Sequence, residues 1–459
     1  MWRFAAPQGL AEPQLPCRMG LRALALTGPL AYEARDRNPQ AQGDPFHMPV
    51  LVMKFGGTSV ANLDRIRRAA KRVGVEVAKG YDVIVIVSAM SGKTNELVGW
   101  VDETSPLYDA REYDAVVSSG ENVTAGLMAL TLQEMDVPAR SWQGWQVPLK
   151  TNSAHSQARI EEIPPENIRA KFAEGMKVAV VAGFQGISPE GRITTLGRGG
   201  SDTTAVAFAA AFEAERCDIY TDVDGVYTTD PRICDKARKL DKIAFEEMLE
   251  LASLGAKVLQ TRSVELAMRY KVKLRVLSSF EEQSDEAGTL VCDEEEIMES
   301  NVVAGVAYSR DEAKLTVQSV ADRPGIAATI FTTLSDAGVN VDMIVQDISE
   351  EGRTDMTFSC PTDQVARAEQ ALLAIKEKGE LNYAELLADR DVAKVSVVGI
   401  GMRSQSGVAA KMFKVLSDEG INIKVITTSE IKISVLIDRK YMELAVQALH
   451  DAFELQKAG

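Results

Sequence analysis

Residues 50–59 read VLVMKFGGTS, an apolar run rich in β-branched side chains that passes directly into two glycines. Continuous apolar runs of this length are typical of strands buried on both faces of a parallel sheet. Gly56 and Gly57 lack a Cβ atom, so a turn there can bring backbone N–H groups against a phosphate. Lys54 supplies a positive charge just before the turn. On these residues alone, a glycine turn beside a surface lysine is an equally good interpretation.

The sequence on either side alternates strand-like and helix-like segments. Further strands are predicted at Asp82–Ser88, Lys177–Phe184, Cys217–Asp222 and Val272–Ser278. Helices are predicted at Leu63–Lys79, Glu121–Met135, Ser201–Glu213 and Phe245–Tyr270. This alternation predicts a three-layer α/β/α domain over residues 48–300, with a mainly parallel sheet between two helical layers. Ligands of such sheets bind at the carboxyl ends of the strands, which is where the glycines fall.

A second glycine cluster, LGRGGSDTT, covers residues 196–204 and leads into an alanine-rich helix. A sharp turn into a helix N-terminus is a favourable site for an anion. Arg198 can bind a carboxylate through two parallel hydrogen bonds. Asp202 can orient a lysine ammonium or a magnesium-bound phosphate. These two charged residues favour a functional interpretation over turn chemistry alone.

Two other glycine motifs fail on spacing. Gly92-Lys93-Thr94 resembles the end of a P-loop, but the first glycine of that motif would fall on Val87. Gly399-Ile400-Gly401 lacks the third glycine of a dinucleotide fingerprint, because that position is Ser404. Neither a P-loop nor a dinucleotide-binding fold is therefore expected.

Composition indicates a globular chain of two or three domains, with 46% hydrophobic and 25% charged residues among 459. The net charge of −15 disfavours nucleic acid as the main partner. No apolar run approaches the ~18 residues of a membrane helix, so no membrane partner is expected and the protein is predicted to be cytoplasmic. Five scattered cysteines and three histidines make a disulfide framework or a histidine-centred metal site improbable. Residues 1–47 hold six of the sixteen prolines and no lysine, and are predicted to be a disordered extension.

The C-terminal part contains an internal repeat. Residues 325–341 (GIAATIFTTLSDAGVNV) align without gaps with residues 407–423 (GVAAKMFKVLSDEGINI), and nine of the seventeen positions are identical. Each copy has the pattern of a ferredoxin-like βαββαβ unit. We therefore expect two such domains, at residues 301–385 and 386–459.

Six motifs in series carry a resemblance to a known family. In chain order they are KFGGTS at residue 54, SAM at 88, SSGE at 118, GFQG at 183, TLGRGGSD at 195 and TDVDGVYTTDPR at 221. Together they resemble the monofunctional aspartate kinases of the amino-acid kinase fold. The segments DRPG at 322 and NVD at 340 resemble the ACT domain, an amino-acid-sensing module that this family carries twice. The resemblance covers residues 48–459.

The resemblance implies a set of site residues. Lys54, Arg198 and Asp202 would be catalytic. The nucleotide would contact Lys54, Gly56, Gly57, Ser59, Ser88, Thr221, Asp222, Tyr227, Asp230, Arg232, Lys257 and Val258. The amino-acid substrate would contact Thr94, Glu121, Arg198, Ser201 and Asp202. A regulatory effector would contact Asp322, Gly325, Ile326, Ala327, Asn340, Asp342, Gln346, Asn422, Ile423, Ser429 and Glu430. Mg²⁺ is expected with ATP, but no residue is assigned as its direct ligand.

Structural roles compete with several of these assignments. Tyr227 could pack on the sheet, Lys257 could be a solvated helix residue, and a glutamate at position 121 could serve only the helix dipole.

The activity implied is ATP-dependent phosphorylation of the side-chain carboxylate of L-aspartate, the first step toward lysine, threonine and methionine, with lysine, threonine or both as inhibitors. An ionised carboxylate needs no general base, so positioning and charge neutralisation would suffice. Two alternatives stay open: another amino-acid kinase of this fold, acting on glutamate or acetylglutamate, and a catalytically silent amino-acid sensor. ACT units commonly pair their sheets, so a homo-oligomer is expected.

Overall fold

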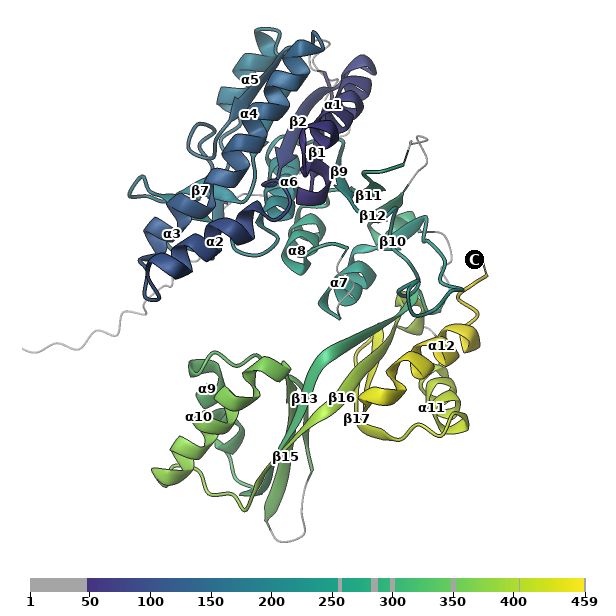
Figure 1. Cartoon of the computed structure of the whole chain (residues 1–459). Helices are drawn as coiled ribbons and strands as arrows, with labels where there is room; N and C mark the ends of the chain where they lie inside the picture. Colours follow the sequence, from purple (N-terminus) through teal and green to yellow (C-terminus); the bar gives the residue numbers. More distant parts are fainter. Residues whose placement is uncertain are drawn as a thin grey trace, which may run out of the picture. The chain divides into compact units, whose positions relative to one another are not determined.

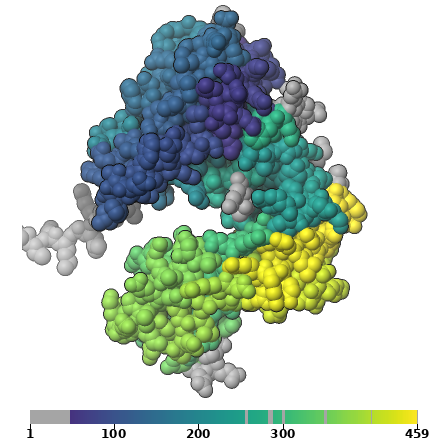
Figure 2. Space-filling model, in the orientation of Figure 1, coloured from purple at the N-terminus to yellow at the C-terminus, as the bar shows by residue number. Residues whose placement is uncertain are grey.

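The computed structural model describes residues 48–254, 258–281, 288–297, 302–347, 352–403 and 405–457, which belong to one compact unit beginning at Phe46. The predictions for the extension 1–47 and for Lys257 lie outside the described residues. Within these ranges, no helix has both the length and the apolar composition needed to cross a membrane. In Figure 2, residues 48–297, where the catalytic residues are expected (the catalytic half), carry the purple to teal surface. Residues 302–457, where the effector is expected to bind (the regulatory half), carry the green to yellow surface.

An eight-stranded sheet organises the catalytic half. Its order is β10-β12-β11-β9-β1-β2-β6-β3, and every neighbouring pair is parallel except β11 with β12. The strands are β1 (Val50–Phe55), β2 (Asp82–Val87), β3 (Ala139–Trp142), β6 (Val178–Ala182), β9 (Arg216–Thr221), β10 (Lys242–Ala244), β11 (Leu274–Ser278) and β12 (Thr289–Cys292). This mainly parallel sheet confirms the fold class expected from the sequence.

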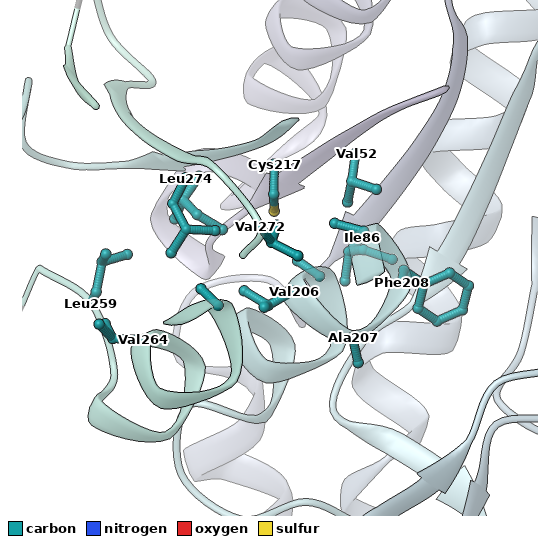
Figure 3. Packing of buried hydrophobic residues seen from close by; sticks show 14 of the residues in the cluster. Val52, Ile86, Val206, Ala207, Phe208, Cys217, Leu259, Val264, Val272 and Leu274 are labelled. Atoms are coloured by element: carbon teal, nitrogen blue, oxygen red, sulfur yellow. The ribbon is translucent and has the colours of Figure 1, made fainter. Parts of the chain in front are cut away.

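Helices cover both faces of the sheet (Figure 1). Since side chains alternate along a strand, Leu51, Met53 and Phe55 pack with α1 (Leu63–Ala78) and α4 (Ser119–Glu134). Val50 and Val52 belong to the opposite cluster, which includes α5 (Glu166–Ala173), α6 (Gly200–Ala211), α7 (Phe245–Ser253) and α8 (Thr261–Tyr270). Figure 3 shows Val206 and Phe208 of α6 near Val52 and Ile86 of the sheet, and Val264 of α8 beside Leu259. The two clusters bury both faces of the sheet.

A smaller sheet, not predicted from the sequence, lies in the same half. It has the order β5-β4-β7-β8, with β4 (Lys150–Thr151), β5 (Ile160–Glu162), β7 (Gln185–Ile187) and β8 (Ile193–Thr195). Two helices, α2 (Lys93–Thr104) and α3 (Ala110–Val117), were likewise not predicted.

Most predicted elements differ from the structure by one or two residues at an end, and two differ for a clear physical reason. The helix predicted at Phe245–Tyr270 is two helices, α7 and α8, because Gly255 interrupts its pattern and a glycine is unfavourable inside a helix. The strand predicted at Lys177–Phe184 ends at Ala182, because Phe184 takes a φ of 69° that turns the chain out of the sheet and into β7. Ser201 lies inside α6, whose N-cap is Gly199.

The regulatory half is built on one six-stranded antiparallel sheet, with the order β14-β15-β13-β16-β18-β17. Its first copy contains β13 (Gly305–Ala321), α9 (Ile326–Asp336), β14 (Asp342–Gln346), β15 (Arg353–Cys360) and α10 (Val365–Glu377). Its second copy contains β16 (Leu386–Val398), α11 (Val408–Asp418), β17 (Ile423–Thr428), β18 (Lys432–Asp438) and α12 (Met442–Ala452). Gly325 and Gly407 begin α9 and α11 with φ values of 98° and 96°, so the two copies share the same helix start.

The two long strands are shared between the copies. The end of β13 pairs with the start of β16, at Lys314–Val317 and Leu386–Asp389. The start of β13 pairs with the end of β16, at Gly305–Ser309 and Lys394–Val398. Each copy therefore completes its four-stranded βαββαβ unit with a strand segment from the other copy.

Candidate active site

Lys54 lies near the end of β1. Because side chains alternate along a strand, Lys54 faces the same side of the sheet as Val50 and Val52, which is the side covered by α6. Its ammonium Nζ lies 2.5 Å from Oδ1 of Asp202, in the first turn of α6. Both side chains are nearly buried, with exposed fractions of 10% and 12%. A lysine and an aspartate in low-dielectric surroundings hold each other strongly, so this ion pair fixes the position of the ammonium.

The glycine turn after β1 permits close approach of the backbone. It continues into a short 3₁₀ helix, Gly57–Val60. A Cβ atom at Gly57 would lie 3.0 Å from the carbonyl oxygen of Ala89, and one at Gly56 would lie 3.4 Å from Nζ of Lys54. A side chain at Gly56 would fill the space beside the lysine, and one at Gly57 would press on the backbone of Ala89.

A second turn carries Arg198 to the N-terminus of α6. Gly197 and Gly199 have φ values of 77° and 72°, a conformation that favours glycine. A Cβ atom at Gly199 would also collide with the side chain of Gln260. Arg198 between them is exposed, which leaves its guanidinium available to a ligand.

Glu121 is a buried carboxyl in the first turn of α4. The backbone N–H of Ala89 donates to its Oε1 at 3.1 Å, while its Oε2 has no hydrogen-bond partner among the described residues. Burial raises the pKa of this carboxyl to about 7. A helix-dipole role alone does not account for a glutamate buried to this degree, and a cationic ligand group would supply the missing partner.

These side chains line one cleft of about 1350 Å³ at the carboxyl ends of β1, β2, β6 and β9. Ten of the residues assigned to nucleotide or substrate line it: Lys54, Gly56, Gly57, Ser88, Thr94, Glu121, Arg198, Ser201, Asp202 and Thr221. Lys54 and Arg198, from motifs far apart in the chain, therefore face the same space.

Some assigned nucleotide residues lie outside this lining. Ser59 is buried, and its hydroxyl donates to the carbonyl of Tyr220 at 3.2 Å. The Tyr227 hydroxyl donates to Asp224 at 3.0 Å. Asp222 and Val258 also lie outside the lining residues. Their contacts with a nucleotide stay predictions.

Asp230 and Arg232 bind each other beside the regulatory half. The Arg232 guanidinium lies 2.7 Å from Oδ2 of Asp230 and lowers the pKa of that carboxyl to about 2. The hydroxyl of Tyr308, on β13, donates to the same oxygen at 2.9 Å. Their predicted contacts with the nucleotide likewise stay predictions.

Comparison with known proteins identifies the family. Residues 49–278 match the amino acid kinase family, and residues 315–377 and 395–453 each match an ACT domain. An aspartate kinase from Stutzerimonas stutzeri is 53% identical over 409 residues, which cover 89% of this chain and 98% of that protein. An aspartokinase from Pseudomonas aeruginosa is 52% identical over 410 residues, with the same shares of the two chains. The chain belongs to the aspartate kinase family.

Solved aspartokinase structures share the fold. The crystal structure of Escherichia coli aspartokinase III in complex with aspartate and ADP has a TM-score of 0.72 at 28% identity, covering 88% of this chain and 99% of that one. The structure of the same protein with lysine and aspartate has a TM-score of 0.69 at 29% identity, with the same coverage. This chain is an aspartate kinase: it uses ATP to phosphorylate aspartate, and its ACT domains indicate allosteric regulation.

Several cleft residues of this aspartate kinase were not predicted from the sequence, among them Ser156, Gln157, Arg159, Phe184 and Arg262. They come from the loop before β5, from the turn after β6 and from α8. Arg262 donates to the carbonyls of Leu196 at 2.9 Å and Ala158 at 3.0 Å. Phe184 lies in the GFQG motif but was not assigned to the site, and no motif marks the other four, which only the fold brings to the cleft.

The assigned effector residues of the aspartate kinase lie around α9 and β14 in the first ACT copy and around β17 in the second. Asp322, Gly325, Ile326 and Ala327 surround the start of α9, Asn340, Asp342 and Gln346 lie on or beside β14, and Asn422, Ile423, Ser429 and Glu430 lie at the two ends of β17. Lys394 of β16 lies 2.7 Å from Asp342 and 2.5 Å from the buried Glu312. This lysine ties β14 to the strand shared by both copies.

The regulatory half also contacts the loop that follows β9. The Oγ1 of Thr228 lies 2.9 Å from Nε2 of His450, a fully buried residue of α12. The N–H of Val306 donates to the carbonyl of Thr228 at 2.8 Å. Thr228 belongs to the TDVDGVYTTDPR motif, so the ACT domains contact a segment assigned to the nucleotide.

Proposed function

We propose that the cleft brings the γ-phosphate of ATP and the side-chain carboxylate of L-aspartate together. The phosphates would lie over the turn at Gly56 and Gly57, beside the Lys54 ammonium. The aspartate would lie between Arg198 and Glu121. The observation that carries this proposal is that Lys54, Arg198 and Glu121 line the same cleft.

The reaction is a direct transfer. A carboxylate oxygen of aspartate attacks the γ-phosphorus, the new O–P bond forms as the bond to the bridging β,γ-oxygen breaks, and ADP leaves with the electron pair. An ionised carboxylate carries no proton to remove, so no general base is needed. Catalysis then rests on positioning and on neutralisation of phosphoryl charge.

Lys54 supplies the fixed positive charge in this scheme. Its ammonium is already held by Asp202 at 2.5 Å, so it does not have to reorganise when the nucleotide binds. The N-terminus of α6, which begins at Gly200, adds its partial positive charge on the same side of the cleft.

Mg²⁺ is expected to arrive with the nucleotide. Among the described residues, no cluster of three or more acidic, cysteine or histidine side chains could hold a metal ion by itself. Mg²⁺ usually keeps several waters and binds through phosphates with one or two carboxylates, so Asp202 is the residue that fits this role. The ion would neutralise part of the phosphate charge.

Glu121 and Arg198 together select an amino acid. A buried carboxylate with one unpartnered oxygen suits a substrate ammonium, and an arginine suits a substrate carboxylate. An N-acylated substrate such as acetylglutamate has no ammonium and would leave Glu121 unsatisfied. This favours a free amino acid in the cleft.

We further infer that lysine, threonine or both inhibit the enzyme through the ACT domains. The structure of Escherichia coli aspartokinase III with lysine supports lysine as an effector of this family. An inhibitor acts only by binding one conformation more tightly, so the catalytic half must have at least two. A homo-oligomer would cover apolar side chains such as Ile344 and Ile426, which are 51% and 43% exposed on β14 and β17.

Trapping of the acyl phosphate by hydroxylamine tests the substrate assignment. The enzyme would be given ATP, Mg²⁺ and, in separate reactions, L-aspartate, L-glutamate or N-acetyl-L-glutamate. Hydroxamate from aspartate alone is expected. Hydroxamate from glutamate but not aspartate would refute the substrate, and no hydroxamate from any of them would favour the sensor.

A further inference from the structure

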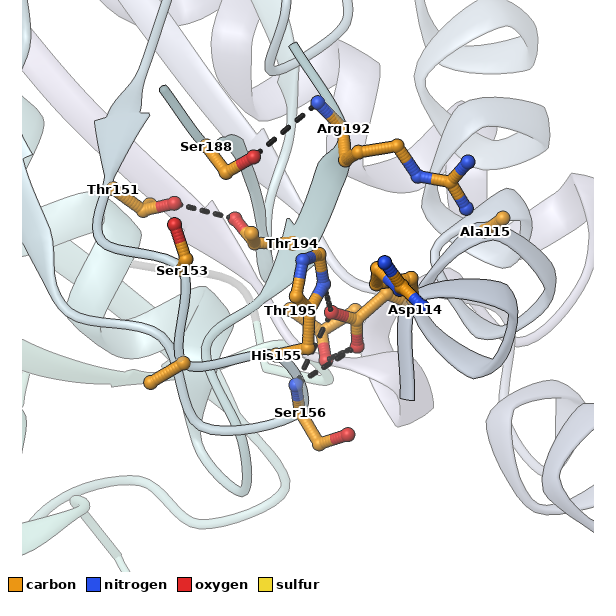
Figure 4. A network of polar contacts seen from close by, with 12 residues as sticks. Asp114, Ala115, Thr151, Ser153, His155, Ser156, Ser188, Arg192, Thr194 and Thr195 are labelled. Atoms are coloured by element: carbon orange, nitrogen blue, oxygen red, sulfur yellow. Dashed lines mark hydrogen bonds and ion pairs between the residues drawn. The ribbon is translucent and has the colours of Figure 1, made fainter. Parts of the chain in front are cut away.

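Asp114 is a fully buried carboxylate on α3 that belongs to none of the six motifs. Its Oδ1 accepts from the hydroxyl of Thr195 at 2.6 Å. Its Oδ2 lies 2.7 Å from Nδ1 of His155, and both oxygens lie 3.1 Å from the backbone N–H of Ser156. Figure 4 shows these contacts converging on the one carboxylate.

The partners of Asp114 lie on two segments that border the cleft. His155 and Ser156 belong to the loop between β4 and β5, and Ser156 itself lines the cleft. Thr195 ends β8, and the turn with Arg198 follows directly. The N–H of Ala158 donates to the carbonyl of Thr195 at 2.9 Å, so the two segments also bond to each other.

A side chain of α8 also binds both of these segments. Arg262 of α8 donates to Leu196 and Ala158, one residue from each segment. The turn is also tightly packed, because a Cβ atom at Gly197 would lie 3.2 Å from the carbonyl oxygen of Ser156. The chain is therefore held at Thr195 and Leu196, and Arg198 is the exposed residue that follows.

The side chain at position 114 must accept these hydrogen bonds and must carry no proton of its own to donate. An aspartate carboxylate has only acceptor sites, which match the N–H of Ser156 and the O–H of Thr195. An asparagine has the same shape but replaces one oxygen by an NH₂ group, so it leaves one of these donors facing another donor. The exchange perturbs the network without opening a cavity.

We infer that Asp114 is a positioning residue for the amino-acid substrate, acting through Thr195 on the turn that presents Arg198 to the substrate carboxylate. The inference rests on the proposed role of Arg198. A displaced Arg198 would weaken contacts with the amino acid and spare those with the nucleotide, which lies over the turn after β1.

Steady-state kinetics of matched threonine variants test the inference. T195V removes the hydroxyl that binds Asp114, and T195S keeps it. T194V is the control, because Thr194 is the adjacent buried threonine and its hydroxyl lies 2.6 Å from that of Thr151, away from Asp114 (Figure 4). T195V should raise KM for aspartate about tenfold and KM for ATP less than about twofold. T195S and T194V should remain within about twofold of the parent for both substrates.

A cycle with R198A separates this inference from the proposed function. If Thr195 acts through Arg198, T195V should add less than about twofold to KM for aspartate in the R198A background. No effect of R198A itself on KM for aspartate would overturn the role of Arg198. If R198A does raise KM for aspartate, two results would overturn the positioning role alone. One is that T195V has the same KM for aspartate as T194V, and the other is that the effects of T195V and R198A on KM for aspartate are additive in the double variant.

D114N is the second variant if T195V does not fold, and thermal unfolding of each variant reports on folding. D114N should show the same selective rise in KM for aspartate. Equal rises in KM for both substrates, or a fall in kcat alone, would indicate a merely structural role and would overturn the inference.

Discussion

The ammonium of Lys54 lies 2.5 Å from the carboxylate of Asp202, which joins the end of β1 to the first turn of α6. The two residues come from different sequence motifs, and their contact is a consequence of the parallel sheet. Lys54 points toward α6 because side chains alternate along β1, and Asp202 lies there because α6 packs on that face of the sheet. The ion pair places the ammonium beside Gly56 and against the first turn of α6.

Replacement of Lys54 tests the role of this charge. K54M keeps the length of the side chain and removes the ammonium, so kcat should fall about 100-fold or more. Asp202 would be left as a buried carboxylate without its partner, so K54M should also lose stability, and K54M/D202N should regain it. Kinetics and thermal unfolding measured together distinguish the two effects. A kcat for K54M close to that of the parent would contradict the catalytic role.

The raised pKa of Glu121 predicts a pH dependence of substrate capture. Only the ionised carboxylate attracts an ammonium, so kcat/KM for aspartate should rise with pH up to about 7 and then level off. E121Q should have a KM for aspartate raised about tenfold or more, without this dependence. A parent profile flat between pH 5.5 and 8 would count against the assignment.

The same pKa shift predicts a change in stability. The folded state holds the Glu121 proton more tightly than the unfolded state does, so this group favours folding fully below pH 4.5, and its contribution is lost as pH rises to about 7. The loss amounts to about 3 kcal/mol. Without ligands at pH 8, E121Q should therefore unfold at a higher temperature than the parent. A lower unfolding temperature for E121Q under these conditions would be inconsistent with a raised pKa.

The contact between Thr228 and His450 predicts communication between the ACT domains and the nucleotide. H450L removes one of the two partners of the Thr228 hydroxyl, which also accepts from the N–H of Arg238. We expect KM for ATP to rise several-fold with little change in KM for aspartate. T228V should have a similar effect, and the double variant should add little. K236A is a matched control, because Lys236 contacts Asp451 of the same helix through an exposed pair of little energetic value. Equal effects of K236A and H450L would argue against a specific link.

Effector binding is tested at Asp342. Added lysine and threonine, singly and together, should lower the rate of the parent enzyme. D342N weakens the contact with Lys394 and removes a charge assigned to effector recognition, so half-inhibition should need about tenfold more effector. D336N changes an exposed aspartate at the end of α9 and serves as the control. Indifference of the parent enzyme to both amino acids would contradict the effector proposal.

The parts of the fold predicted best from the sequence are those with a strong local signal. The buried strands β1 and β2 are continuous apolar runs, and the ACT duplication shows as a repeat whose helices α9 and α11 begin at equivalent glycines. The short strands of the second sheet carry no such signal, because two or three residues are too few for a periodic pattern. The sharing of β13 and β16 between the ACT copies could not be predicted either, since strand pairing is a long-range property.

The site residues also divide into those that a sequence motif marks and those that only the fold brings to the cleft. Lys54, Arg198 and Asp202 stand in glycine-rich motifs whose chemistry could be recognised in the sequence. Asp114 and Arg262 stand in ordinary helical sequence, and their importance follows only from the loops that the fold places against them.

The stereochemical course at phosphorus tests the central claim most directly. ATP made chiral at the γ-phosphorus with oxygen isotopes would be turned over with aspartate, and the configuration of the transferred phosphoryl group determined. Direct transfer between two substrates bound in one cleft predicts inversion. Retention would indicate two successive transfers through a phosphorylated enzyme residue, and would contradict the mechanism proposed for this cleft.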